Sequence, residues 1–169
     1  MGRPVIRNKN TFWGKVSEII LFLFVVWMVL WPICQFARLP ETIPTHINIR
    51  GDIDGYGNRI VVLVLPIVGV LFYVGLSFLQ KVPHLYNYPI EVTDDNARVL
   101  YALGVQMVRF VKTIMIIMLV YLTYSLICLA RGVKLRFGAV IIICSCVVLA
   151  IGMVFYIVKM KKLGKQSAL

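Results

Sequence analysis

Charged side chains are scarce in this sequence, and acidic ones are the scarcest. Only 15% of the 169 residues are charged, with 7 Asp and Glu against 18 Lys and Arg. Soluble globular domains usually carry about 25% charged residues, and disordered segments lack the apolar residues that make up 60% of this chain. The composition therefore argues against a soluble enzyme and a disordered tail. It indicates that much of the apolar surface meets lipid, because a core of this size could not bury it all.

Cysteines are few as well, and they lie in or at the ends of apolar runs. They are Cys34, Cys128, Cys144 and Cys146. This pattern argues against a disulfide-rich secreted scaffold, and we expect small apolar packing residues. A disulfide between Cys34 and Cys128 is the alternative, since both approach the oxidising face in the topology described below.

Ionisable residues are missing where membrane chemistry would need them, because no pair of them is expected at bilayer depth. Glu18 stands at the start of the first apolar run, where a carboxylate can stay hydrated at the membrane edge. Proton-coupled transporters and intramembrane proteases place Asp, Glu or His within the bilayer, since such costly groups are kept for function. We therefore expect no enzyme and no cofactor.

Long apolar runs are what the sequence has in abundance. Four of them reach the roughly 20 residues that a helix needs to cross a bilayer, at about 16–37, 60–79, 99–130 and 137–158. Backbone groups in lipid must be bonded within their own segment, so each run should be helical. The sequence thus predicts an all-α, polytopic protein with four transmembrane helices in a single membrane domain, residues 1–169.

Basic residues border these runs unequally and set the expected orientation. Twelve lie on the side of the two termini: Arg3, Arg7, Lys9, Lys15, Lys81, Arg98, Arg109, Lys112, Lys159, Lys161, Lys162 and Lys165. Six lie on the other side: Arg38, Arg50, Arg59, Arg131, Lys134 and Arg136. We expect both termini in the cytoplasm and the protein in the inner (plasma) membrane, with basic residues against anionic lipid heads. Charge scattered in this way argues against nucleic acid as a partner.

The third run carries basic residues along one face of its first turns. Arg98, Arg109 and Lys112 fall near one another at about 100° per residue. The favoured interpretation is a stripe of side chains that reach lipid headgroups. The alternative is a cytoplasmic interface at which a regulator docks.

The most distinctive segment, residues 38–59, joins the first two runs. Thr45–Ile49 alternates apolar and polar residues like a short strand, and turn dipeptides follow at 51–52, 54–55 and 57–58. We expect Asp54 to cap a turn before Gly55. The composition indicates an ordered loop, and ordered loops between helices often carry function.

A metal site in this loop is the less favoured interpretation of its polar residues. His46, Asp52 and Asp54 are candidate ligands, but one His and two Asp without a repeating spacing are weak evidence. His84 is expected on the opposite side of the membrane. We favour a neutral His46 that is hydrogen-bonded within the loop, and we expect no metal ion.

The loop also resembles a known family. The matching residues are Leu39, Pro40, Ile43, Pro44, Thr45, His46, Asn48, Gly51, Asp54, Gly55, Tyr56 and Gly57. They look like the signature of a small bacterial membrane domain of unknown function, which also occurs in immunity proteins against the sporulation-delaying toxin peptide. Tyr56 stands where the family commonly has Trp. A second stretch also resembles short family members, with Asn87, Tyr88, Pro89, Glu91, Thr93 and Asn96.

The resemblance implies an extracytoplasmic loop between the first two helices and a role in toxin immunity or signalling. Together with the ordered loop, it predicts recognition of an extracytoplasmic peptide, toxin or envelope component. The ligand-binding or loop-defining residues would be Pro44, Thr45, His46, Asn48, Gly51, Asp54, Gly55 and Gly57. The alternative function is a subunit of a membrane transporter or channel, with the polar residues of the third run along its pathway.

Overall fold

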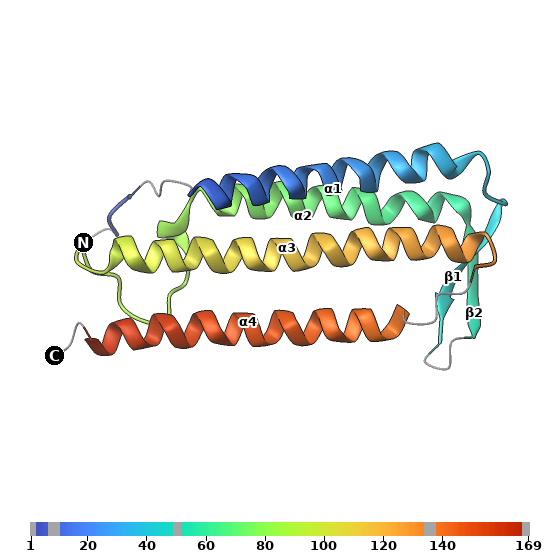
Figure 1. Cartoon of the computed structure of the whole chain (residues 1–169). Coiled ribbons are helices and arrows are strands. Elements are labelled where there is room, and N and C mark those ends of the chain that lie inside the picture. The colour runs from blue at the N-terminus through green and yellow to red at the C-terminus, as the bar shows by residue number, and fades with distance from the viewer. Residues whose placement is uncertain (1–2, 7–10, 49–51, 134–137, 167–169) are drawn as a thin grey trace.

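The computed structural model describes residues 3–6, 11–48, 52–133 and 138–166. Four long helices lie along a common axis, and a two-stranded β-hairpin lies at one end of them (Figure 1). The helices are α1 (Phe12–Phe36), α2 (Val64–Leu79), α3 (Ala97–Ala130) and α4 (Gly138–Gln166). The strands are β1 (Thr42–Ile47) and β2 (Ile53–Asn58). Both termini lie at the opposite end (Figure 1), so the two ends are called the hairpin end and the terminal end below.

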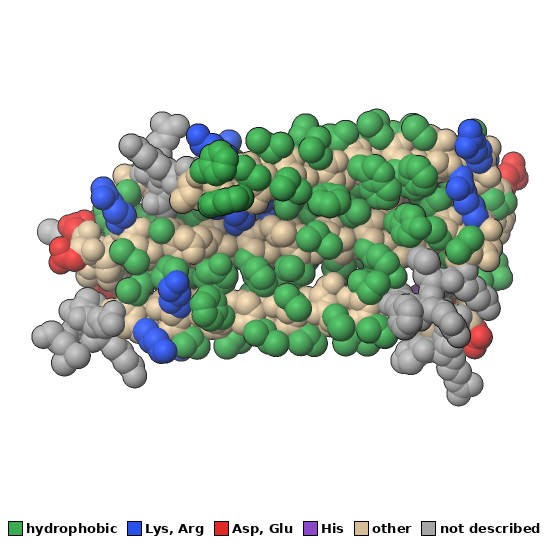
Figure 2. All heavy atoms as spheres, viewed as in Figure 1, with side chains coloured by type: hydrophobic (Ala, Val, Ile, Leu, Met, Phe, Trp, Pro, Cys, Tyr) green, Lys and Arg blue, Asp and Glu red, His purple; other side chains and the backbone are tan. Residues whose placement is uncertain are grey.

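Within the part of the chain that the structure describes, four helical spans are long and apolar enough to cross a membrane. They are Phe12–Phe36, Arg59–Leu79, Ala97–Ala130 and Ala139–Gly164. The second includes a short 3₁₀ helix, η1 (Arg59–Leu63), that leads into α2. Hydrophobic side chains cover the length of the bundle in Figure 2, while charged side chains gather toward its two ends. The prediction of four helices that are long and apolar enough to cross a membrane is confirmed, and these findings suggest a membrane protein.

Helix α3 is the central element, because it packs against each of the other three long helices. In the middle of the bundle, Ile116 of α3 is buried against Leu21 and Val25 of α1. At the terminal end, Leu100 and Leu103 are buried against Met160 of α4. At these contacts the apolar side chains of neighbouring helices are closely packed against one another.

Two glycines allow helices to approach closely. A Cβ added at Gly69 of α2 would collide with the end of the Met28 side chain on α1, and one at Gly152 of α4 would collide with the Phe110 ring on α3. Small residues at such crossings let van der Waals packing hold helices together in lipid. All four cysteines have free thiols in the structure.

The prediction of an all-α fold is incomplete, because the loop between the first two spans contains the hairpin. β1 pairs antiparallel with β2, with Thr42 opposite Asn58 and Pro44 opposite Tyr56. The register shifts on each side of His46, which faces Gly55. The predicted strand at Thr45–Ile49 is therefore displaced toward the N-terminus and gains a partner.

The expected turn at Asp54 and Gly55 is wrong, since both residues lie within β2. Local dipeptide statistics favour a turn there, but pairing with β1 keeps the backbone extended. The strands are joined instead near Asn48 and Asp52, where the Asn48 N–H donates to the Asp52 carbonyl.

Candidate functional site

The hairpin is fixed to the helices by an apolar cluster at its base. Ile43 of β1 has 0% of its surface exposed and packs with Leu39 and Val62. Ile127 and Ala130, at the end of α3, complete the cluster. Burying a side chain such as Ile43 contributes about 1.5–3 kcal/mol relative to water, so the hairpin has a defined position on the bundle.

Arg59 adds polar contacts at the same base. Its backbone N–H donates to the carbonyl of Glu41 at 2.9 Å, and its Nη1 donates to the carbonyl of Leu39 at 3.1 Å. Its guanidinium lies 5.0 Å from the centre of the Phe36 ring, a distance at which a cation is attracted to an aromatic face. Arg59, which directly follows β2, thereby contacts the end of α1 and the segment that leads into β1.

Asn48 closes the tip of the hairpin. Its backbone N–H donates to the carbonyl of Asp52, and its Oδ1 accepts from the Asp52 N–H, each at 2.9 Å. An Asn side chain that bonds a backbone group in this way stabilises a turn. Asn48 thus joins the ends of the two strands, and Gly51 lies outside the described residues.

His46 and Asp54 form an exposed pair across the two strands. Nδ1 of His46 is hydrogen-bonded to Oδ1 of Asp54. The two side chains keep 70% and 45% of their surface exposed, respectively. The expected hydrogen bond of His46 within the loop is therefore present, and its partner is Asp54. Within the described ranges, no three His, Cys, Asp or Glu side chains gather as potential metal ligands.

Gly55 and Gly57 leave room for the side chains of the opposite strand. A Cβ added at Gly55 would lie 2.9 Å from the Cβ of His46, and one at Gly57 would lie 3.0 Å from Cγ2 of Thr45. Glycine within a strand often marks such a close approach. The predicted residues Thr45, His46, Gly55 and Gly57 are thus in direct contact, which the sequence pattern alone could not show.

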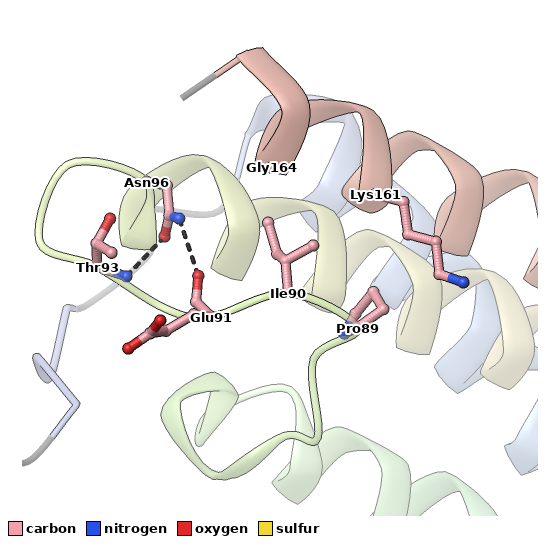
Figure 3. A pocket seen from close by; sticks show the side chains of 7 residues that line it. All are labelled: Pro89, Ile90, Glu91, Thr93, Asn96, Lys161 and Gly164. Carbon is pink, nitrogen blue, oxygen red and sulfur yellow. Dashed lines mark hydrogen bonds between the residues drawn. The ribbon is translucent and has the colours of Figure 1, made fainter. Parts of the chain in front are cut away.

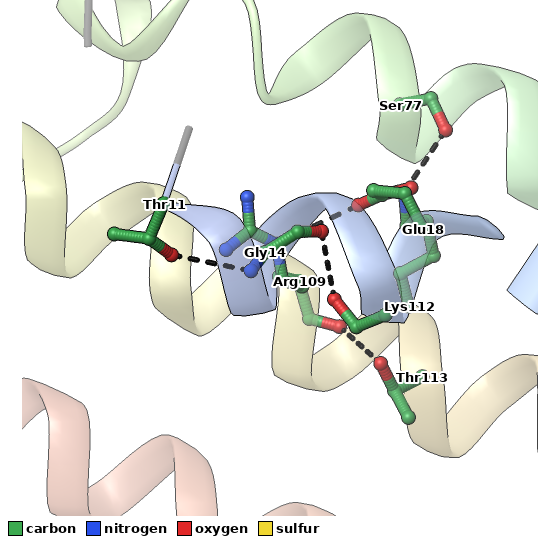
Figure 4. A network of polar contacts seen from close by, with 8 residues as sticks. Thr11, Gly14, Glu18, Ser77, Arg109, Lys112 and Thr113 are labelled. Carbon is green, nitrogen blue, oxygen red and sulfur yellow. Dashed lines mark hydrogen bonds and ion pairs between the residues drawn. The ribbon is translucent and has the colours of Figure 1, made fainter. Parts of the chain in front are cut away.

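A second polar cluster, which sequence reasoning missed, joins α1, α2 and α3 (Figure 4). Nζ of Lys112 donates to Oε2 of Glu18 at 2.5 Å and to Oγ of Ser77 at 3.0 Å. Nε of Arg109 lies 3.5 Å from Oε1 of Glu18. With its amide oriented to suit both neighbours, Gln80 also donates to Glu18 at 3.1 Å and accepts from Lys112 at 3.2 Å. We call these five residues the charge network.

The charge network is largely shielded from solvent. Lys112 has 0% of its side chain exposed, Arg109 has 18% and Glu18 has 23%. Glu18 lies about 27 Å along α1 from its hairpin end, close to the boundary of a hydrocarbon core about 30 Å thick. Glu18 is thus stabilised by two cations rather than by water alone.

The expected interface of Arg98, Arg109 and Lys112 does not form one exposed face. Arg98 is exposed, whereas Lys112 is buried. The cause is packing: α3 meets both α1 and α2 at the level of Lys112, so a face that is open near its start becomes covered. The sequence did show a single Glu in the first span and a Lys inside the third. Whether these two side chains form an ion pair depends on how each helix is rotated about its axis, which the sequence does not give.

Arg109 lies against the first turn of α1. Thr11 caps this helix by accepting a hydrogen bond from the Gly14 N–H at 3.2 Å. A Cβ added at Gly14 would lie 2.7 Å from Nη1 of Arg109. Gly14 therefore makes room for the guanidinium next to Glu18 (Figure 4).

The segment between α2 and α3 forms an aromatic cap at the terminal end. The ring of Tyr88 lies 5.8 Å from that of Tyr86 and 5.7 Å from that of Tyr101. Hydroxyls of Tyr88 and Tyr101 donate to the carbonyls of Pro83 and Pro4 at 2.9 Å and 3.0 Å. Burial raises the pKa of Tyr86 to about 12 and raises that of Tyr88 as well.

A pocket of about 520 Å³ lies between this segment and α4 (Figure 3). Its lining includes Pro89, Glu91, Thr93 and Asn96, all from the second stretch of family resemblance. Asn96 holds the wall in shape, since its Oδ1 accepts from the Thr93 N–H and its Nδ2 donates to the Glu91 carbonyl, each at 3.0 Å. At least one residue of this stretch, Asn96, therefore stabilises the local backbone with its side chain.

Comparisons with known proteins reach only part of the chain. A family described as a domain of unknown function (DUF1648) matches residues 19–70, which cover most of α1, the hairpin and the start of α2. An uncharacterized protein of Archaeoglobus fulgidus is 27% identical over 84 residues, covering 45% of this chain and 46% of that relative. The chain thus matches less than half of the relative's length. No solved structure matches. Most of α1, the hairpin and the start of α2 are the part of this chain that resembles a domain of unknown function.

Proposed function

We propose that this is a membrane-embedded recognition protein of the immunity or signalling type, whose hairpin binds an extracytoplasmic peptide, toxin or envelope component. One observation supports this most: a hairpin fixed at its base carries an exposed polar pair, His46 and Asp54. A segment that only connected two helices would need neither a buried anchor nor paired strands. Structured loops on rigid scaffolds are common binding elements.

The hairpin offers chemistry that suits a peptide. His46 bonds Asp54 through Nδ1, which leaves its Nε2 and the second Asp54 oxygen as polar groups on an exposed surface. Tyr56 is 66% exposed, and aromatic side chains of this kind contribute strongly at protein interfaces. A donor or acceptor, an anion and a ring therefore lie within a few residues of one another.

The proposed orientation follows from the unequal distribution of basic residues. Both termini would lie in the cytoplasm, and the hairpin would face the outside of the inner membrane. A cytoplasmic regulator would then meet Arg98 at the terminal end, since Lys112 is buried. The bilayer itself is the other proposed partner.

The transporter or channel alternative has less support. Among the polar residues of α3, Thr113 donates to the carbonyl of Arg109 at 2.9 Å and Thr123 donates to that of Leu119 at 2.8 Å. These hydroxyls satisfy their own helix and do not point to a solute pathway.

A survival assay tests the proposed function. Bacteria with and without the protein would be challenged with secreted bacterial peptide toxins, using His46→Ala and Asp54→Asn as site variants. Asp52→Asn is the matched control, because it removes an exposed carboxylate near the tip that does not pair with His46. We expect the wild type and the control to protect, and both site variants to lose protection at equal levels in the membrane. Full protection by both site variants, or no protection by the wild type against any toxin, would contradict the proposal.

A further inference from the structure

A groove between α3 and α4 at the terminal end combines an apolar wall with positive charge. Its volume is about 340 Å³. The wall includes Val99, Ala102 and Leu103 of α3, and the polar groups come from Gln106, Lys159 and Lys162. None of the described residues that line it is acidic, so none of them supplies a counterion to the two lysines.

Lys159 and Lys162 lie on the same face of α4, because residues three apart are neighbours on a helix. Nζ of Lys159 lies 5.9 Å from the centre of the Phe155 ring, so its stem lies along the apolar side of the helix. Lys161 lies between them in sequence but lines the neighbouring pocket, together with Glu91. Adjacent lysines of one helix therefore have different surroundings.

The groove lies at the level expected for lipid headgroups. Lys159 is about 32 Å along α4 from its start at Gly138. Gln106 is about 36 Å along α3 from its hairpin end at Ala130. A hydrocarbon core is about 30 Å thick. Met160 of α4 packs against Leu100 and Leu103 of α3, about 40–45 Å along α3 from Ala130. The lysines next to Met160 therefore lie at the headgroup level of a bilayer that is about 40–45 Å thick with its headgroups.

We propose that this groove binds one anionic phospholipid from the leaflet at the terminal end. The lipid phosphate lies between the ammonium groups of Lys159 and Lys162, which attract it as point charges. The glycerol and the start of an acyl chain lie against Ala102 and Leu103 at the level of Lys159, and the chain continues past Gln106 toward the middle of the bundle. Charge complementarity selects the headgroup, and the apolar wall selects a lipid over a soluble anion.

Lipid binding to the purified full-length protein tests this site. Native mass spectrometry in detergent would count bound phosphatidylglycerol and phosphatidylcholine for the wild type, for Lys159→Gln/Lys162→Gln and for Lys81→Gln/Lys161→Gln. The last variant removes the same charge at the same end, outside the groove. The attraction of one basic side chain to anionic lipid predicts a loss of roughly fivefold for each lysine removed from the groove.

We expect one phosphatidylglycerol to be retained in preference to phosphatidylcholine by the wild type and by the control variant. The groove variant should bind it about 25-fold more weakly, and Lys159→Arg/Lys162→Arg should restore binding because the charge is kept. Size-exclusion chromatography would verify that each variant is folded. Three results would overturn the proposal: equal loss in the control variant, equal retention of both lipids by the wild type, and displacement of the lipid by millimolar inorganic phosphate.

Discussion

Lys112 on α3 donates to Glu18 on α1 over 2.5 Å, although 94 residues separate the two in sequence. Ser77 on α2 accepts from the same ammonium group, so a single side chain connects three helices. Removing one member of a buried ion pair leaves the other charge without compensation, and this costs more than the intact pair contributes.

Replacing Lys112 by Met should therefore destabilise the bundle. Arg109 remains near Glu18, and Glu18 keeps 23% of its surface exposed, so we expect a loss of about 2–4 kcal/mol, somewhat less than for a fully buried pair. Unfolding in detergent, followed by circular dichroism, would measure it. Arg98→Met is the control, because this arginine is exposed on the same helix.

The double variant Glu18→Gln/Lys112→Met tests whether Glu18 and Lys112 stabilise the protein as an interacting pair or independently of each other. We expect it to be more stable than the sum of the single losses predicts, because Glu18 and Lys112 no longer leave each other's charge unpaired. Strict additivity would show that Glu18 and Lys112 do not interact as described.

Adding a methyl group to the hairpin glycines should disturb the contact between the strands. Gly55→Ala would place a Cβ 2.9 Å from that of His46, a distance that forces the strands apart. Overpacking of this kind typically costs about 1–3 kcal/mol. Hydrogen exchange of the Asp52 amide would report the loosened tip. Gly75→Ala is the control, since nothing lies within 4 Å of the position of its added Cβ, and its exchange at Asp52 should match the wild type.

Truncating Ile43 should release the hairpin from the bundle. Ile43→Ala leaves a cavity among Leu39, Val62 and Ile127, and large-to-small changes at buried sites cost about 2–5 kcal/mol. A spin-label pair placed on the hairpin and α3 should show a broader distance distribution. Ile60→Ala provides the comparison, because Ile60 is 61% exposed. An unchanged distribution in Ile43→Ala would show that the cluster does not hold the hairpin.

The proposed orientation can be checked by thiol labelling in intact cells. In a background without the four native cysteines, Asp52→Cys should react with a membrane-impermeant maleimide, whereas Lys162→Cys should react only after the membrane is permeabilised. The physical reason is the excess of basic residues at the terminal end, which favours the cytoplasm. The reverse labelling pattern would place the hairpin in the cytoplasm and remove the basis for extracytoplasmic recognition.

The spans were predictable because length and apolar content decide whether a helix can cross lipid. The run at 60–79 and the observed span Arg59–Leu79 differ by one residue at the start. The hairpin was predicted only in part. Asp54-Gly55 is a favoured turn dipeptide, yet cross-strand packing against His46 places it in β2, and this constraint lies outside the local sequence.

The charge network could not be predicted for a different reason. A basic stripe on α3 is compatible with headgroups, with a partner protein or with a neighbouring helix, and only helix rotation decides among them. Arg98 remains exposed while Lys112 is covered by α1 and α2. Sequence periodicity places these residues on one face, but it does not say where along α3 that face becomes covered.

During synthesis, the hairpin leaves the ribosome well before the surface on which it rests. Its anchor Ile43 packs with Ile127 and Ala130, which are made about half a chain later, so the cluster cannot be completed until the end of α3 has been synthesised. The segment shared with the domain of unknown function, residues 19–70, ends before that surface exists. Chains halted before the end of α3 would therefore expose Ile43, and we expect membrane proteases to degrade them faster than the full chain. Completion of α3 is the step that buries Ile43 and stabilises the hairpin.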